Sequence, residues 1–88
     1  MSRARIYTSR ACPFCSAAKR LLSSLGAEVE ETPLDDQPEL RAQLSRAHGN
    51  WSTVPMVFIG DEFVGGYDDT ARLHREGRLV PMLFPDRG

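Results

Sequence analysis

The chain lacks a strong charge of either sign and has no long apolar run. Its 88 residues carry 11 basic and 12 acidic side chains, which gives a net charge of −1. That balance provides no electrostatic reason to expect binding to nucleic acid or to an anionic membrane. The longest apolar runs, such as residues 54–59, are far shorter than the roughly 20 residues that cross a bilayer. We therefore expect neither nucleic acid nor a membrane among the partners.

The first residues also lack the apolar stretch of a secretory signal behind the basic Arg3 and Arg5. The composition, 41% hydrophobic and 26% charged, is ordinary for a small globular protein. No repeat or linker interrupts the sequence. We expect a single domain over residues 1–88, monomeric and cytoplasmic.

Cysteine and histidine are scarce. The only cysteines are Cys12 and Cys15, in the sequence CPFC, and the only histidines are His48 and His74. A secreted scaffold held by disulfides would carry more cysteines. A structural zinc site needs about four ligands, which these residues do not offer at a suitable spacing, so we expect no metal.

The two cysteines still admit three interpretations: a redox dithiol, half of a metal site, or a buried structural pair. Their spacing favours the dithiol, because residues three apart on a helix are neighbours on one face. A disulfide needs Cα atoms within roughly 4.4–6.8 Å, and that spacing supplies them.

Hydrophobic spacing and turn residues predict four strands and three helices. The strands are expected at residues 5–8, 28–34, 54–59 and 62–64. The first helix is expected at residues 13–25, with Cys15, Ala18, Leu22 and Leu25 on one face. The second is expected to run from a capping box at residues 36–39 to Gly49, with Leu40, Leu44 and Ala47 buried. The third is expected to run from a cap at Asp68 or Asp69 to about Glu76. The order β-α-β-α-β-β-α predicts an α/β fold, a four-stranded mixed sheet flanked by three helices on both faces.

Three motifs in this order resemble the glutaredoxin family: CPFC at residues 12–15, TVP at 53–55 and GGYD at 65–68. The resemblance covers residues 5–84 and implies a thioredoxin-like fold. Phe14 stands where this family usually has tyrosine. Cys15 matches the dithiol members, since single-cysteine members have serine there. Ser9 stands where some relatives carry a basic residue.

Cys12 is the predicted nucleophile. At the start of a helix its sulfur faces unpaired N–H groups, which favour the thiolate, and Arg10 and Lys19 add positive potential. Cys15, one turn later, either resolves a mixed disulfide formed on Cys12 or packs as a small apolar side chain. The alternative for Lys19 is a solvated charge on the exposed face of the helix, without contact to a ligand.

The resemblance also implies a glutathione site. Val54, before a cis Pro55, would pair its backbone with the extended tripeptide; the backbone of Tyr67 and Asp68 would bind the γ-glutamyl carboxylate, and the Asp68 side chain its ammonium. Arg41 would reach the glycyl carboxylate. The full predicted set is Arg10, Phe14, Arg41, Thr53, Val54, Pro55, Gly66, Tyr67 and Asp68. Each residue also has an alternative without glutathione. Pro55 would be a proline at the start of an edge strand, GGYD a turn with an aspartate N-cap, and Arg41 a solvated surface arginine. Trp51 either borders the groove or packs beneath the TVP loop.

The resemblance implies a glutathione-dependent thiol–disulfide oxidoreductase that reduces protein disulfides and glutathione mixed disulfides. Glutathione is then the reducing co-substrate, no cofactor is bound, and the partners are disulfide-containing or glutathionylated proteins. Two alternatives remain. One is a related redoxin reduced by thioredoxin reductase or by another small thiol, and the other is an iron–sulfur cluster protein, which Pro13 disfavours.

Overall fold

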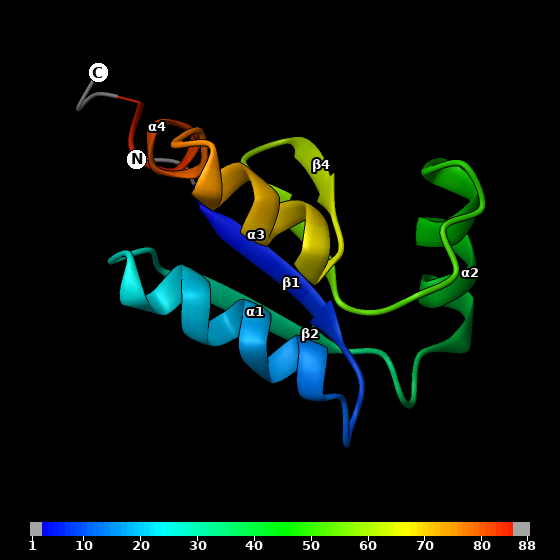
Figure 1. The fold of residues 1–88 in the computed structure, drawn as a ribbon. Helices are drawn as coiled ribbons and strands as arrows, with labels where there is room; N and C mark the ends of the chain where they lie inside the picture. Colours follow the sequence, from blue (N-terminus) through cyan, green and yellow to red (C-terminus); the bar gives the residue numbers. More distant parts are fainter. Residues whose placement is uncertain (1–2, 86–88) are drawn as a thin grey trace.

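The structure, a computed structural model, describes residues 3–85 as a four-stranded sheet with helices on both faces (Figure 1). In chain order the elements are β1 Ala4–Thr8, α1 Pro13–Ser24, β2 Val29–Pro33, α2 Pro38–Ala47, β3 Met56–Ile59, β4 Glu62–Gly65, α3 Tyr67–Arg75 and α4 Leu79–Leu83. The expected α/β fold is confirmed.

The sheet is mixed, with strand order β2-β1-β3-β4. β1 runs parallel to β2, with Ala4 beside Val29, and antiparallel to β3, with Tyr7 beside Met56. β4 returns antiparallel to β3 and forms one edge. The carboxyl end of β1 therefore leads directly into the loop before α1, where the two cysteines lie.

Alternation along the central strands divides the core between the two faces. On one face, Ile6 and Val57 pack with Ala18 and Leu22 of α1 and with α4. On the other face, the cluster of Leu34, Met56 and Phe58 contacts Leu40 and Leu44 of α2 together with Trp51 and Phe63. Figure 1 shows α1 and α3 side by side across the sheet, with α2 apart from them. The first helix buries the predicted Cys15, Ala18 and Leu22.

A fourth helix, α4, was not predicted. It is only five residues long and contains Pro81, so its sequence offers little helical signal. Leu79 and Leu83, four residues apart, are fully buried in the core, where α4 lies beside α3, which explains why the segment folds back onto the sheet.

The ends of other elements also differ from the prediction. α3 begins at Tyr67 with Gly66 as its N-cap, so the expected cap by Asp68 or Asp69 is wrong. α2 has no side-chain cap: its N-cap is Gln37, whose amide donates to the Pro33 carbonyl oxygen at 3.0 Å, and the expected capping box is absent. Ala47, expected in the buried stripe, is exposed. β3 begins at Met56 rather than at Val54, since Pro55 has no N–H to donate to a neighbouring strand.

Candidate active site

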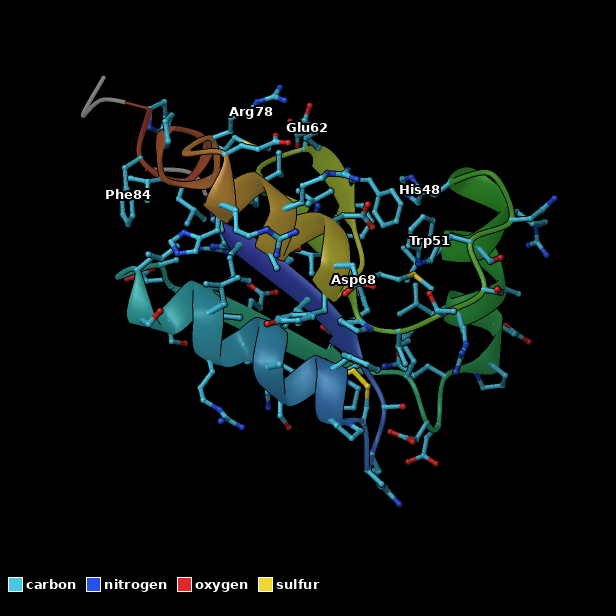
Figure 2. The ribbon with its side chains drawn as sticks, viewed as in Figure 1. His48, Trp51, Glu62, Asp68, Arg78 and Phe84 are labelled. Atoms are coloured by element: carbon cyan, nitrogen blue, oxygen red, sulfur yellow. A yellow bond between two sulfur atoms is a disulfide. The ribbon has the colours of Figure 1, made fainter. Side chains whose placement is uncertain are left out.

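The two cysteines lie at the start of α1. Cys12 is the N-cap residue in extended conformation, Pro13 occupies the first helical position, and Cys15 lies one turn inside the helix. Their Cα atoms are 5.2 Å apart and their sulfurs form a disulfide. The spacing therefore produces the bridge that the sequence predicts. Figure 2 shows it at the amino end of α1.

The helix start favours negative charge on Cys12. The Cys15 backbone N–H donates to Cys12 Sγ at 3.2 Å, and the side chain of Cys12 thereby caps the helix. Such a bond and the positive end of the helix dipole stabilise a thiolate more than a thiol. Cys15 is only 2% exposed, whereas Cys12 is partly exposed, so an incoming disulfide reaches Cys12 first.

A groove of about 350 Å³ brings most of the predicted binding residues together beside Cys12. Its lining contains the predicted Phe14, Thr53, Val54, Pro55, Gly66, Tyr67 and Asp68, and also Trp51 and Asp69. Cys12 Sγ lies 3.9 Å from the Val54 carbonyl oxygen, and the Val54–Pro55 peptide bond is cis, as the resemblance implied.

The rings of Phe14 and Tyr67 both line this groove and lie next to each other, with centroids 6.0 Å apart. Phe14 is 59% exposed, which is unusual for a large apolar side chain and leaves its ring available for contact beside the disulfide. Phenylalanine here preserves the aromatic wall without a hydroxyl group.

The start of α3 closes one end of the groove. Gly66 is the N-cap, and its N–H donates to Asp69 Oδ2 at 3.0 Å. A Cβ on Gly65 would collide with the Asp69 carboxylate, and Gly65 has a φ of 120°, so position 65 requires glycine. Asp69 is thus the structural carboxylate, while the Asp68 carboxylate is exposed and has no partner within residues 3–85.

The two predicted arginines do not line the groove. Arg10 lies on the other side of Cys12, with Nη2 3.6 Å from Asp36 Oδ2, and its backbone N–H donates to Asp35. Arg41 on α2 donates from Nη2 to the Ser52 carbonyl oxygen at 3.3 Å, immediately before Thr53. Arg41 is therefore near the TVP end of the groove, and Arg10 is farther from it.

A second, more polar hollow of about 600 Å³ lies on the opposite side of the dithiol and is lined in part by Cys12, Cys15, Lys19 and Glu31. Lys19 Nζ donates to Glu31 Oε1 at 2.9 Å, and the buried Thr8 hydroxyl donates to Glu31 Oε2 at 2.7 Å. These hydrogen bonds, from Lys19 first and then Thr8, lower the pKa of Glu31 below its ordinary 4.5. Sequence reasoning missed Glu31, because the weak pattern of its strand gave no signal for it.

This cluster makes part of the stability dependent on pH. Because folding lowers the pKa of Glu31, its contribution is present above about pH 4.5 and is lost as the pH falls through the lowered value. Glu31→Gln should destabilise the protein by roughly 0.2–1 kcal/mol near pH 7, the usual range for a partly exposed ion pair. The difference should shrink at a pH well below 4.5, where the carboxyl is protonated in the folded and in the unfolded protein, as measured by urea unfolding at the two pH values.

Glu28→Gln is the matched control, because the Glu28 carboxylate has no partner among the described residues. It should leave the urea midpoint unchanged at both pH values. An equal effect of the two substitutions would contradict the assigned role of the Glu31 cluster.

The described part of the chain, residues 3–85, contains no group of three or more histidine, cysteine, aspartate or glutamate side chains arranged to hold a metal ion. Nor does any of its helices have the length and apolar character needed to cross a membrane.

A disulfide at the start of a helix, in a sheet of thioredoxin-like order, marks the class of thiol–disulfide oxidoreductases. Comparison with known proteins narrows this class to one family. The glutaredoxin sequence profile matches residues 4–64. The chain belongs to the glutaredoxin family.

Individual relatives agree over nearly the whole chain. A glutaredoxin of Pseudomonas aeruginosa is 46% identical over 78 residues, covering 89% of this chain and 92% of the relative. Glutaredoxin 3 of Escherichia coli is 40% identical over 83 residues, covering 94% and 99%. The crystal structure of a buckwheat glutaredoxin–glutathione complex matches with a TM-score of 0.86 at 35% identity, covering 96% of this chain and 78% of that one.

Proposed function

We propose that this protein is a glutathione-dependent oxidoreductase that reduces protein disulfides and glutathione mixed disulfides through Cys12 and Cys15. The observation that carries the proposal is the groove beside Cys12, where the TVP loop and the start of α3 meet. A groove with an unpaired backbone on one side and a helix start on the other suits an extended peptide with a terminal carboxylate. The likeness to a glutaredoxin that binds glutathione supports the same assignment.

Each end of the groove has a role in this proposal. The Val54 backbone N–H, which has no partner within residues 3–85, pairs with the cysteinyl part of glutathione. The N–H groups of Tyr67 and Asp68 open α3 and hold the γ-glutamyl carboxylate. The exposed Asp68 carboxylate accepts hydrogen bonds from the γ-glutamyl ammonium. Phe14, Thr53, Pro55 and Gly66 complete the walls.

In this proposal, the two arginines bind the glycyl carboxylate of glutathione. Arg41 is bonded beside Ser52, next to the TVP loop, so its guanidinium has only a short way to move. Arg10 has to leave Asp36, but both side chains of that pair are largely exposed, 79% and 89%, and exposed ion pairs contribute little. We assign Arg41 the principal contact and Arg10 an accessory one.

The reaction follows two routes that share a first attack. In the one-cysteine route, the Cys12 thiolate attacks the glutathionyl sulfur of a mixed disulfide, and the substrate protein leaves as its thiolate, which takes up a proton. A second glutathione thiolate then attacks the Cys12-bound glutathione, which releases oxidised glutathione and the Cys12 thiolate.

In the two-cysteine route, the Cys12 thiolate attacks a protein disulfide and forms a mixed disulfide. Cys15 loses its proton to solvent and attacks Cys12 Sγ; the Cys12–Cys15 disulfide forms and the protein thiolate leaves. Two glutathione molecules restore the dithiol and are oxidised together. We further propose that the protein acts as a cytoplasmic monomer, with residues 1–88 as one domain, and that it needs no bound cofactor.

The Asp68 contact gives the test of this proposal. Asp68→Asn should raise the KM for glutathione roughly tenfold and leave kcat nearly unchanged, because a charge-assisted hydrogen bond to the ammonium is lost. Initial rates at varied glutathione concentration measure the effect. Asp61→Asn removes the same charge from the turn between β3 and β4, outside the groove, and should leave KM unchanged. Equal KM values for Asp68→Asn and the unmodified protein would refute the proposed recognition.

A further inference from the structure

We propose that Trp51 is a specificity-determining residue, whose indole contacts the γ-glutamyl part of the bound thiol and favours γ-glutamyl peptides over short thiols. The inference rests on the proposed function and concerns the same groove. Nothing in the sequence decides between this role and simple packing beneath the loop.

The indole lies at the γ-glutamyl end of the groove. Trp51 lines the groove together with Tyr67 and Asp68. Its Cζ2 lies 3.7 Å from the position that a Cβ on Gly66 would occupy, so the ring edge covers the backbone that opens α3. Figure 2 labels Trp51 in the space between α2 and the start of α3, where Asp68 is also labelled. The proposed ammonium partner and the indole therefore border the same end.

Aromatic neighbours hold the ring in this orientation. Trp51 contacts Phe63 edge to face at a centroid distance of 5.2 Å, and Phe63 in turn contacts Phe58 at 5.1 Å and His48 at 4.5 Å. Since this stack ties the indole to the core under α2, the groove wall is preformed before a ligand arrives.

Packing alone does not account for a tryptophan at this position. The indole Nε1 is buried and has no hydrogen-bond partner in the described part of the chain. Burying a donor without an acceptor costs free energy, which a phenylalanine would avoid while still contacting Phe63. What tryptophan adds is a larger aromatic surface at the groove, and that addition is explained by a ligand that uses it.

The γ-glutamyl group has the chemistry that this surface recognises. It carries two methylene groups, which pack on an aromatic ring, and an ammonium, which is attracted to a ring face within about 6 Å. The ammonium would then lie between the Asp68 carboxylate and the indole. A short thiol such as 2-mercaptoethanol has neither feature and reaches only Cys12.

Trp51 is the only tryptophan of the chain, so its emission reports the contact directly. The Cys15→Ser variant is treated with oxidised glutathione: the Cys12 thiolate attacks one sulfur, the Cys12–glutathione disulfide forms, and one glutathione leaves as thiolate. A parallel sample is treated with 2-hydroxyethyl disulfide, which places only 2-mercaptoethanol on Cys12. Mass spectrometry verifies both adducts.

The expected result is a change in Trp51 emission on glutathionylation that is at least twice the change with 2-mercaptoethanol. Equal changes for the two adducts would overturn the role of Trp51 and leave the proposed function standing. Absence of the glutathione adduct beside a complete 2-mercaptoethanol adduct would instead count against the proposed function itself.

Steady-state kinetics test the role of Trp51 independently. Trp51→Ala should raise the KM for glutathione roughly five- to tenfold with kcat nearly unchanged, and Trp51→Phe should recover much of the loss. His48→Ala is the control for damage to the aromatic stack, since His48 contacts Phe63 but does not line the groove. Because Phe63 still contacts Trp51 in this variant, it should lower the thermal midpoint and change KM by less than about twofold. A KM increase equal to that of Trp51→Ala would overturn the proposal.

Discussion

Replacing Cys12 by serine is expected to abolish both activities, with rates at least roughly a thousandfold below those of the unmodified protein. A hydroxyl at this position has no accessible anion near neutral pH and cannot form a disulfide, so neither route can begin. The hydrogen bond from the Cys15 N–H, which favours the thiolate, then has no reactive anion to stabilise. The rates are measured with a glutathionylated peptide and with a protein disulfide.

Ser23→Ala is the matched control, because Ser23 is exposed near the far end of the same helix. It should retain full activity toward both substrates. Residual activity of Cys12→Ser toward either substrate above the uncatalysed rate would contradict the assignment of Cys12 as the nucleophile.

Cys15→Ser is expected to separate the two activities. Reduction of the protein disulfide should fall by roughly a hundredfold, because the mixed disulfide on Cys12 loses its resolving thiol. Deglutathionylation should stay within about threefold of the unmodified protein, since external glutathione supplies the second thiol. Cys15 is buried one turn inside α1, with its Cα 5.2 Å from that of Cys12, a position suited to resolution and poorly exposed to outside substrates.

Both rates are measured on one preparation with the same two substrates. Loss of both activities in Cys15→Ser would contradict the one-cysteine route. Retention of both would show that protein disulfides are reduced without an internal resolving thiol, and Cys15 would then be a packing residue of the α1 face.

The parts of the fold that follow from strong local signals were predictable. The 3-4 spacing on α1 identified its buried face, and the alternation and turn residues around Gly60 located the β3–β4 hairpin. α4 was not predicted from the sequence, because this helix depends on the tertiary burial of Leu79 and Leu83 more than on local helix preference. The capping box predicted at residues 36–39 is absent, because the N-cap is Gln37, and its side-chain amide donates to the Pro33 carbonyl oxygen and does not cap the helix.

The positions of site residues were predictable where the order of strands and helices determines them. They were not predictable where a long side chain can bond to any of several neighbours. Residues of the CPFC, TVP and GGYD motifs meet at the groove, because the ends of β1, β3 and β4 bring their backbones together. The directions taken by Arg10 and Arg41 depend on Asp36 and on the Ser52 carbonyl, which no spacing reveals. Glu31 joins the site only through contacts between β1, α1 and β2.

The central claim is that glutathione supplies the electrons, and a comparison of electron donors tests it most directly. The purified protein is given a small mixed disulfide with glutathione, glutathione reductase and NADPH, or with thioredoxin reductase and NADPH, and NADPH oxidation is followed. We predict turnover with the glutathione system that depends on Cys12, and none with thioredoxin reductase alone. Turnover with thioredoxin reductase and none with glutathione would contradict the account.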